Sequence, residues 1–219
     1  MIDFTVHTVP GSPFGRSVMV ALEEKGAPWQ LAALAPGETK SPAYLVRHPF
    51  GRVPLLEHGD FELYETQAIL RYLDRILPGP ALAPADPRQA ARMDQLMGIN
   101  DWYLFQGCVN VIAFQRIIAP KFLGASPDLE AIAAVMPRAH LVLETLSWFL
   151  GNQAFLVGEN PTLADLMVAP QIEFLTRTPE WSELSKDRPN LAVWLARLEA
   201  RPSFQRTTWE KLTDLAEAA

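Results

Sequence analysis

The sequence has one cysteine, Cys108, among its 219 residues. A single cysteine excludes an internal disulfide and is typical of a protein from a reducing compartment. No apolar run approaches the roughly 20 residues that a membrane-spanning helix needs. The first residues, MIDFTVHTV, lack the basic and long apolar segments of a secretory signal. We therefore expect a soluble cytoplasmic protein with no membrane partner.

Positive charge is also scarce, because 19 Lys and Arg face 25 Asp and Glu and leave a net charge of −6. No basic stripe is available to neutralise phosphates, which argues against a nucleic-acid partner. No Cys/His cluster predicts a metal site, and no glycine-rich loop predicts a phosphate site. A serine hydrolase is disfavoured because no triad spacing links a serine to the four histidines: His7, His48, His58 and His140.

The chain length fits one large domain or two small ones. Its apolar fraction of 49% and charged fraction of 20% are those of an ordinary globular protein. A core of useful size can therefore form without disulfides or metal.

The first third of the chain alternates strand and helix signals. Turn residues and apolar spacing predict seven elements: a strand at 2–9, a helix between Ser12 and Gly26, a strand at 29–34, a short helix at 42–46, a hairpin of two strands at 53–64 that turns at 58–60, and a helix at 65–77. The order β-α-β-α-β-β-α is that of a thioredoxin-like domain. We place this domain at residues 1–78.

Prolines and a glycine punctuate residues 79–87, a composition typical of a linker. Beyond the linker the sequence predicts no strand. Helical patterns occur at 88–118, 128–150, 161–176, 191–200 and 204–216. The expected fold is thus an α/β thioredoxin-like domain followed by an all-α domain at 88–219.

Two short motifs admit both a structural and a functional interpretation. Proline cannot donate to a strand ladder, so Val53-Pro54 marks a sheet edge or a cis turn. Most X-Pro bonds are trans, but the thioredoxin-like order favours cis, which would leave the Val53 backbone available to an extended peptide. Glu65-Thr66 either caps a helix or lets its N-terminus bind a carboxylate while Glu65 pairs with an α-ammonium.

Three segments in order resemble the cytosolic glutathione transferases: SPFGRSVMVALEEKG, HPFGRVPLLEHGDFELYETQAILRYL and NPTLADLMVAP. The resemblance covers nearly the whole chain and is strongest to the serine-type classes, theta-like and phi-like, and their bacterial relatives. It implies a glutathione-binding first domain, glutathione as co-substrate without metal, and a detoxifying homodimer in which Phe50 is a contact.

The resemblance also implies roles for individual residues. Ser12 would be the activating hydroxyl, and Val53, before a cis Pro54, would pair its backbone with the cysteinyl part of glutathione. Glu65 and Thr66 would hold the γ-glutamyl end.

The glycyl end of glutathione is less defined. Lys40 lies where a basic residue commonly meets the glycyl carboxylate, although it is alternatively a solvated loop lysine. Arg52 stands where many members have Gln or Lys, and His48 where many have Asn. Whether Arg52 or His48 contacts glutathione stays open.

Ser12 is chemically informative because Ser12-Pro13-Phe14-Gly15 occupies the place of a C-P-x-C redox motif. A hydroxyl cannot form mixed disulfides, and Gly15 replaces the second cysteine. The motif therefore favours a hydrogen-bond donor to a thiolate over a disulfide reductase. A serine at a helix start is also an ordinary N-cap.

The expected function is conjugation of glutathione to hydrophobic electrophiles. Alternatives are a glutathione-dependent peroxidase or isomerase, and a non-catalytic ligand carrier or protein-binding member. Thr162-x-x-Asp165 predicts a capping box and Cys108 an inert buried thiol. An electrophile pocket between Ser12 and the helical domain would be lined by aromatics that are otherwise core residues: Phe14, Trp102, Tyr103, Phe105, Phe114 and Trp209.

Overall fold

The computed structural model describes residues 4–218. The chain divides into two compact units. One unit contains the residues up to Leu82 together with those from Glu199 onward, and the other contains Ala83–Leu198. The boundary after Leu82 falls within the predicted linker 79–87.

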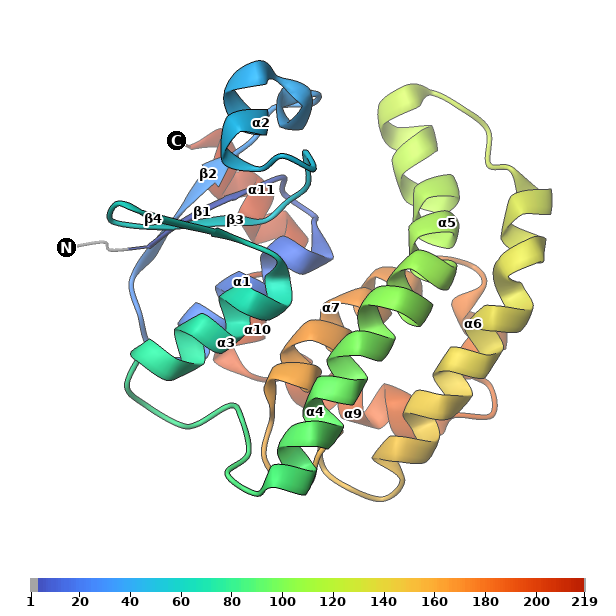
Figure 1. The fold of residues 1–219 in the computed structure, drawn as a ribbon. Coiled ribbons are helices and arrows are strands. Elements are labelled where there is room, and N and C mark those ends of the chain that lie inside the picture. The colour runs from blue at the N-terminus through green and yellow to red at the C-terminus, as the bar shows by residue number, and fades with distance from the viewer. Residues whose placement is uncertain (1–3, 219) are drawn as a thin grey trace. The chain divides into compact units, whose positions relative to one another are not determined.

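The first unit is built on a four-stranded sheet with the order β2-β1-β3-β4 (Figure 1). β1 pairs in parallel with β2, and β3 pairs antiparallel with both β1 and β4. This is the predicted thioredoxin-like arrangement. The strands are β1 (Phe4–Thr8), β2 (Trp29–Ala33), β3 (Leu55–His58) and β4 (Phe61–Tyr64). Residues 2 and 3 of the first predicted strand lie outside the described residues.

Two helices, α1 (Pro13–Glu24) and α3 (Thr66–Ile76), pack together on one face of this sheet (Figure 1). Residues 15–22 of α1 are all buried, as expected for a helix between a sheet and neighbouring helices. A short 3₁₀ turn, η1 (Glu38–Lys40), and α2 (Pro42–Arg47) connect β2 to β3. The predicted elements of this region are confirmed, with ends shifted by a few residues.

The C-terminal segment differs from the sequence prediction in two ways. The helix predicted at 204–216 is broken into α10 (Pro202–Arg206) and α11 (Trp209–Glu217), because the Thr208 side chain accepts a hydrogen bond from the Lys211 N–H and caps a new helix. The segment also belongs to the sheet unit and not to the helical unit, because α10 packs on α1 and α11 on β2. Periodicity identifies a helix but not the surface on which it packs.

The second unit is all-helical, as predicted, and within Ala83–Leu198 the only β pairing is an isolated bridge between Phe155 and Gly158. The helix predicted at 88–118 runs to Leu123, with π-type turns in two stretches. A further short helix, α8, was not predicted. The elements are α4 (Pro87–Ile99), η2 (Asn100–Val109), α5 (Asn110–Ala113), η3 (Phe114–Leu123), α6 (Leu129–Leu150), α7 (Leu163–Thr176), α8 (Trp181–Ser185) and α9 (Pro189–Glu199).

The predicted capping box at the start of α7 is confirmed. Asp165 is fully buried, and its carboxylate accepts hydrogen bonds from both the N–H and the hydroxyl of Thr162 at 2.8 Å. It also accepts from the Leu156 N–H and the Trp194 indole, each at 2.8 Å. Burial raises the pKa of the Asp165 carboxyl, and these hydrogen bonds act in the opposite direction. The residue is therefore a structural centre of the helical unit.

Cys108 is buried in η2, where its thiol donates to the Leu104 carbonyl at 2.9 Å. Burial raises the pKa of this thiol to about 12. The predicted burial of Cys108 is confirmed, and a thiol with so little thiolate is expected to be a poor nucleophile.

Candidate active site

The sheet register brings the predicted site segments to one end of the sheet, where β1, β2 and β4 finish and β3 begins. Thr8 ends β1 and lies beside Ala33, the end of the parallel strand β2. Leu55 begins β3 and pairs with His7 on one side and with Tyr64, the end of β4, on the other. Four loops therefore meet at this end of the sheet: those that follow β1, β2 and β4, and the one that precedes β3. These four loops contain Ser12, Lys40, Glu65 and Val53.

Ser12 is the N-cap of α1, and its Oγ accepts a hydrogen bond from the Gly15 N–H at 3.2 Å. The capping role is thus confirmed. Among residues 4–218 the Ser12 hydroxyl has no hydrogen-bond acceptor of its own. A hydroxyl that accepts from the helix retains its proton for donation elsewhere. The half-buried Ser12 side chain can therefore cap the helix and donate to a ligand at the same time.

Two glycines beside Ser12 make room for close packing, which sequence reasoning did not predict. A Cβ on Gly15 would lie 2.2 Å from Oγ1 of the buried Thr8. Gly11 has φ +87°, and a Cβ there would lie 2.5 Å from Cε2 of Trp209 in α11. The Pro10-Gly11 turn signals the positive φ, but no local pattern indicates either packing partner.

The Val53-Pro54 peptide bond is cis, as predicted. The Val53 side chain packs against a buried cluster of Leu34, Tyr44 and Leu55. In the described part of the chain, the Val53 backbone N–H and C=O make no hydrogen bond. These groups are one donor and one acceptor that an extended peptide could satisfy.

Glu65 is the only residue other than glycine with a positive φ among those described, at +70°. It precedes α3 as the N-cap, but its carboxylate makes no capping hydrogen bond. The capping interpretation therefore does not apply to this side chain. Thr66, the first residue of α3, is buried. A strained backbone that exposes an unpaired carboxylate is a feature of functional sites.

The loop that carries Arg52 is held from the α2 side. Lys40 Nζ lies 3.4 Å from the Gly51 carbonyl, and the Tyr44 hydroxyl donates to the Arg52 carbonyl at 2.7 Å. Burial raises the pKa of Tyr44 to about 12, so the hydroxyl stays a donor. The Lys40 and Arg52 side chains are exposed. Both cations are thus available to an anionic group at this end of the sheet.

His48 is buried, and its ring stacks on Tyr64 with 4.5 Å between centroids. Its Nδ1 has no hydrogen-bond partner in the described chain. Burial lowers the pKa of His48; the charge of Arg52 acts in the same direction and that of Glu65 in the opposite one. The neutral His48 ring packs on Tyr64, the last residue of β4, which directly precedes Glu65.

The candidate electrophile residues come from both units. Phe14 and Trp209 are half-buried in the sheet unit. In the helical unit Trp102 is 72% exposed, and Tyr103 and Phe114 are exposed too, so these three are not core residues. Phe105 is half-buried in η2.

Neither a membrane helix nor a metal cluster is found within residues 4–218. No helix there combines the length and apolarity needed to cross a membrane. No group of three His, Cys, Asp or Glu side chains is arranged to hold a metal ion.

Comparison with known proteins identifies the family. Residues 6–81 match the N-terminal domain and residues 110–202 the C-terminal domain of glutathione S-transferases. A probable glutathione S-transferase of Oryza sativa subsp. japonica is 33% identical over 190 residues, which cover 86% of this chain and 87% of that protein. The chain belongs to the cytosolic glutathione S-transferase family.

Two solved structures of glutathione transferases are similar to this chain over nearly its whole length. Glutathione transferase F7 from Populus trichocarpa has a TM-score of 0.84 and 27% identity, covering 97% of this chain and 99% of that one. A glutathione S-transferase-I bound with lactoylglutathione has a TM-score of 0.82 and 28% identity, covering 99% and 100%. The homologues include plant members of the phi class, and this chain is phi-like.

Proposed function

We propose that this protein binds glutathione at this end of the sheet and holds the glutathione thiolate with the Ser12 hydroxyl. The enzyme then conjugates glutathione to hydrophobic electrophiles. The observation that carries the proposal is the Ser12 hydroxyl, which accepts from the Gly15 N–H and has no acceptor among the described residues. The relative bound with lactoylglutathione, a glutathione derivative, supports the ligand class.

The remaining contacts follow the shape of the tripeptide. The cysteinyl backbone would pair with the N–H and C=O of Val53, which have no partner in the described chain. The γ-glutamyl α-ammonium would meet the Glu65 carboxylate, and its carboxylate would meet the Thr66 end of α3. The glycyl carboxylate would lie near Lys40, with Arg52 close by on the loop that Lys40 contacts.

The energy required of Ser12 is modest. A free thiol with a pKa near 8.5 is only about 3% ionised at pH 7, and a pKa two units lower needs about 2.7 kcal/mol of thiolate stabilisation. A hydrogen bond to a charged acceptor supplies roughly 1.5–3 kcal/mol, and the N-terminus of α1 about 0.3–1 kcal/mol more. Together the hydroxyl and the helix are sufficient.

Ionisation by itself gives little acceleration. The thiolate fraction rises about 25-fold, but a less basic thiolate is a weaker nucleophile and roughly eightfold is lost at the Brønsted slope of thiol exchange. About threefold remains. Most of the rate must therefore come from holding the electrophile beside the sulfur.

Aromatic side chains would hold the electrophile. The exposed Trp102 and Tyr103 are the strongest candidates in the helical unit, because exposed aromatics need another function than core packing. Phe14, Phe105, Phe114 and Trp209 complete the proposed set. An aromatic lining suits aryl halides, enones, epoxides or organic peroxides.

We also propose a homodimer, as the family implies, located in the cytoplasm. Phe50 supports the contact, because it is exposed and its ring is braced edge-on by His48 and Tyr64. A single species of monomeric mass in light scattering at micromolar concentration would contradict the dimer.

The test compares Ser12→Ala with Ser41→Ala. Ser41 caps α2 through the Tyr44 N–H at 3.2 Å, the same length as the Ser12 cap, and also precedes a proline. Each variant should lose about 1 kcal/mol of stability from the missing cap. Only Ser12→Ala should shift the acid limb of the pH–rate profile, upward by about one to two pH units.

The assay uses glutathione with chlorodinitrobenzene, and a hydroperoxide in parallel. At pH 7 Ser12→Ala should be about threefold slower, and the two rates should cross between about pH 7 and 8. Near pH 9, where its more basic and more nucleophilic thiolate is also ionised, the variant should be several-fold faster. An unchanged profile removes Ser12 from the mechanism. If glutathione reacts only with the hydroperoxide and not with chlorodinitrobenzene, the peroxidase alternative is favoured. If calorimetry at millimolar glutathione detects no binding, a carrier is favoured.

A further inference from the structure

The loop between α2 and β3 is attached to the rest of the sheet unit through the carbonyls of two consecutive residues. The Gly51 carbonyl lies 3.4 Å from Lys40 Nζ, and the Arg52 carbonyl accepts a hydrogen bond from the Tyr44 hydroxyl at 2.7 Å. The Tyr44 bond is the shorter of the two. Its side chain is buried, at 4% exposed, whereas Lys40 is exposed. Tyr44 is therefore the firmer of the two attachments.

The position of Tyr44 is itself fixed by several contacts. Its backbone N–H donates to the Ser41 cap of α2 at 3.2 Å, and its carbonyl accepts from the His48 N–H at 2.8 Å where that helix ends. Its ring lies in the buried cluster with Leu34 and Leu55. A side chain whose rotamer is locked by packing can hold a neighbouring group in a defined place. The hydroxyl thus meets the loop from a fixed point.

The Arg52 carbonyl and the Val53 N–H belong to the same peptide unit. This unit is trans, because the only cis bond among residues 4–218 is the next one, Val53-Pro54. In a planar trans peptide the C=O and the N–H point in opposite directions. A carbonyl that is bonded to Tyr44 therefore directs the Val53 N–H away from Tyr44. Within the described chain that N–H has no acceptor, so it is left for a ligand.

The same hydrogen bond also makes the Val53 N–H a better donor. Donation to a peptide carbonyl polarises the whole peptide unit, and linked hydrogen bonds strengthen one another by about 10–30% per bond. The hydroxyl keeps its proton over the pH range of an enzyme assay, because burial raises the pKa of Tyr44 to about 12. Both effects favour an acceptor that lies opposite the Val53 N–H.

We propose that Tyr44 is a positioning residue for glutathione: its hydroxyl orients the Arg52–Val53 peptide so that the Val53 N–H donates to the cysteinyl carbonyl of the tripeptide. This inference rests on the proposed function, which pairs the cysteinyl backbone with Val53. Tyr44 acts through the peptide and needs no contact with the ligand. Its contribution is to the affinity for glutathione, whereas stabilising the thiolate is the role of Ser12.

The test removes the hydroxyl alone. Tyr44→Phe keeps the ring in its cluster and leaves the Arg52 carbonyl without this donor. Calorimetric titration of the full chain with glutathione should show binding about three- to tenfold weaker, the effect of one neutral hydrogen bond. In the conjugation assay the KM for glutathione should rise by a similar factor, while kcat at saturating glutathione should stay within about twofold.

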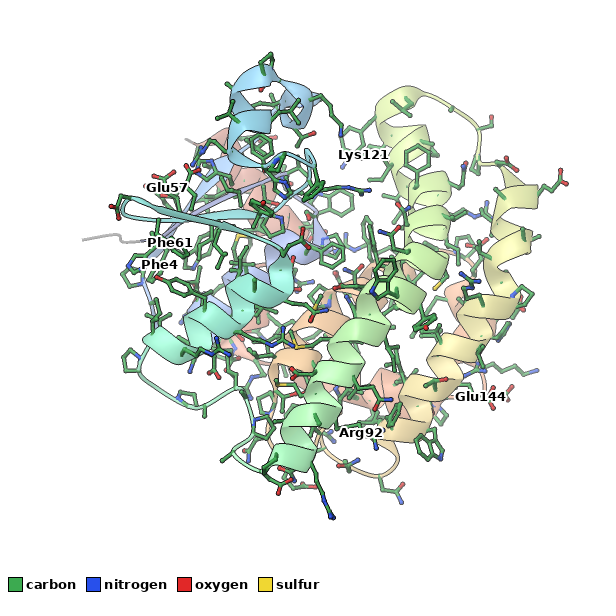
Figure 2. The ribbon with its side chains drawn as sticks, in the orientation of Figure 1. Phe4, Glu57, Phe61, Arg92, Lys121 and Glu144 are labelled. Atoms are coloured by element: carbon green, nitrogen blue, oxygen red, sulfur yellow. The ribbon has the colours of Figure 1, made fainter. Side chains whose placement is uncertain are left out.

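The matched control is Tyr72→Phe, which removes a hydroxyl that hydrogen bonds to His58 Nδ1 at 2.8 Å. His58 is the last residue of β3, whereas the candidate site lies where β3 begins. Figure 2 labels Phe4 and Phe61, whose rings lie beside His58 and Tyr72 respectively, near the hairpin end of the sheet. This variant should bind glutathione within about twofold of wild type. Urea unfolding of both variants shows that each is folded.

A second ligand separates the aim of the N–H from a general loosening of the loop. In the ester analogue of glutathione an oxygen replaces the nitrogen of the cysteinyl–glycyl amide, so its cysteinyl carbonyl is a weaker acceptor. Wild type should prefer glutathione to this ester more strongly than Tyr44→Phe does, because only wild type directs the Val53 N–H at that carbonyl. Any other difference between the two ligands is the same in both proteins and cancels in the comparison.

Three results would overturn the proposal. They are equal glutathione affinity of Tyr44→Phe and Tyr72→Phe, an unchanged preference of Tyr44→Phe between the two ligands, and a loss confined to kcat. In each case wild type still binds glutathione, and the proposed function stands. If wild type binds no glutathione, the proposed function fails and the role of Tyr44 fails with it.

Discussion

The indole of Trp209 fills the space that a side chain on Gly11 would need. A Cβ built on Gly11 would lie 2.5 Å from Cε2 and 2.7 Å from Nε1 of that ring. Gly11 precedes Ser12, and Trp209 is the first residue of α11. The end of the chain therefore sets the shape of the turn that presents the candidate catalytic hydroxyl.

Gly11→Ala should destabilise the protein by about 2 kcal/mol or more, because the new methyl group meets the indole and φ is +87°. In a Trp209→Ala background the steric part should vanish and only the cost of the positive φ, about 1 kcal/mol, should remain. Urea unfolding of the four proteins gives the coupling energy. Equal costs of Gly11→Ala in both backgrounds would refute the contact.

A second prediction concerns the anchor of the C-terminal segment to α1. The Glu24 carboxylate is 7% exposed and receives two hydrogen bonds from Arg201, at 2.7 and 2.6 Å, and one from Ser203. Glu24→Gln should lower the free energy of unfolding by about 3 kcal/mol at neutral pH. Glu23→Gln is the matched control, because its partner Arg206 is 65% exposed and such a pair contributes less than about 1 kcal/mol.

The effect of Glu24 should depend on pH. Burial raises the pKa of this carboxyl, but the hydrogen bonds from Arg201 and Ser203 and the charge of Arg201 outweigh it and leave the pKa lowered. Its stabilisation is therefore present above the ordinary glutamate pKa near 4.3 and is lost as pH falls through the lowered value. The difference between wild type and Glu24→Gln should shrink in acid; a difference that grows in acid would contradict this sign.

His48 should contribute a separate acid sensitivity. Its pKa is lowered by burial, so between that value and the ordinary 6.5 the unfolded chain binds a proton that the folded chain does not, and stability falls as pH falls. From about pH 7.5 to pH 5.5 wild type should lose up to about 1.4 kcal/mol more than His48→Gln. Parallel losses in both proteins, measured by urea unfolding, would show that His48 titrates normally.

Asp165, the buried acidic residue of the α7 capping box, should not tolerate replacement by asparagine. Each oxygen of Asp165 accepts two hydrogen bonds, and at least one donor to each oxygen is an N–H that cannot accept. In Asp165→Asn the NH₂ group must therefore face at least one N–H whichever way it is turned. We expect a loss of about 3 kcal/mol or more. Asp128→Asn is the control, because Asp128 is an exposed N-cap with one bond to the Ala131 N–H, a role that asparagine also performs. A loss below 1 kcal/mol at Asp165 would be inconsistent with the network.

Local signals were sufficient for much of this fold. Pro13 after Ser12, the turn at Gly59 and the Thr162–Asp165 pair each predict an element from a few adjacent residues, and each prediction is confirmed. The cis Val53-Pro54 bond needed the order of the elements as well.

Contacts between distant segments could not be predicted in the same way. Nothing near Thr8 indicates that Gly15 packs against it, and nothing near Gly11 indicates Trp209. The positive φ of Glu65 is equally hidden, because glutamate has no preference for that conformation. These features arise from packing and register, which a single sequence does not reveal.

Because residues from Glu199 onward complete the sheet unit, the helical unit is an insertion within it. Domains generally fold as units during synthesis. The segment Ala83–Leu198 is synthesised before the residues from Glu199 onward, so the helical unit can reach its final form before the sheet unit does. The turn at Ser12 precedes the helical unit in the chain, yet it is completed only when Trp209 has been made.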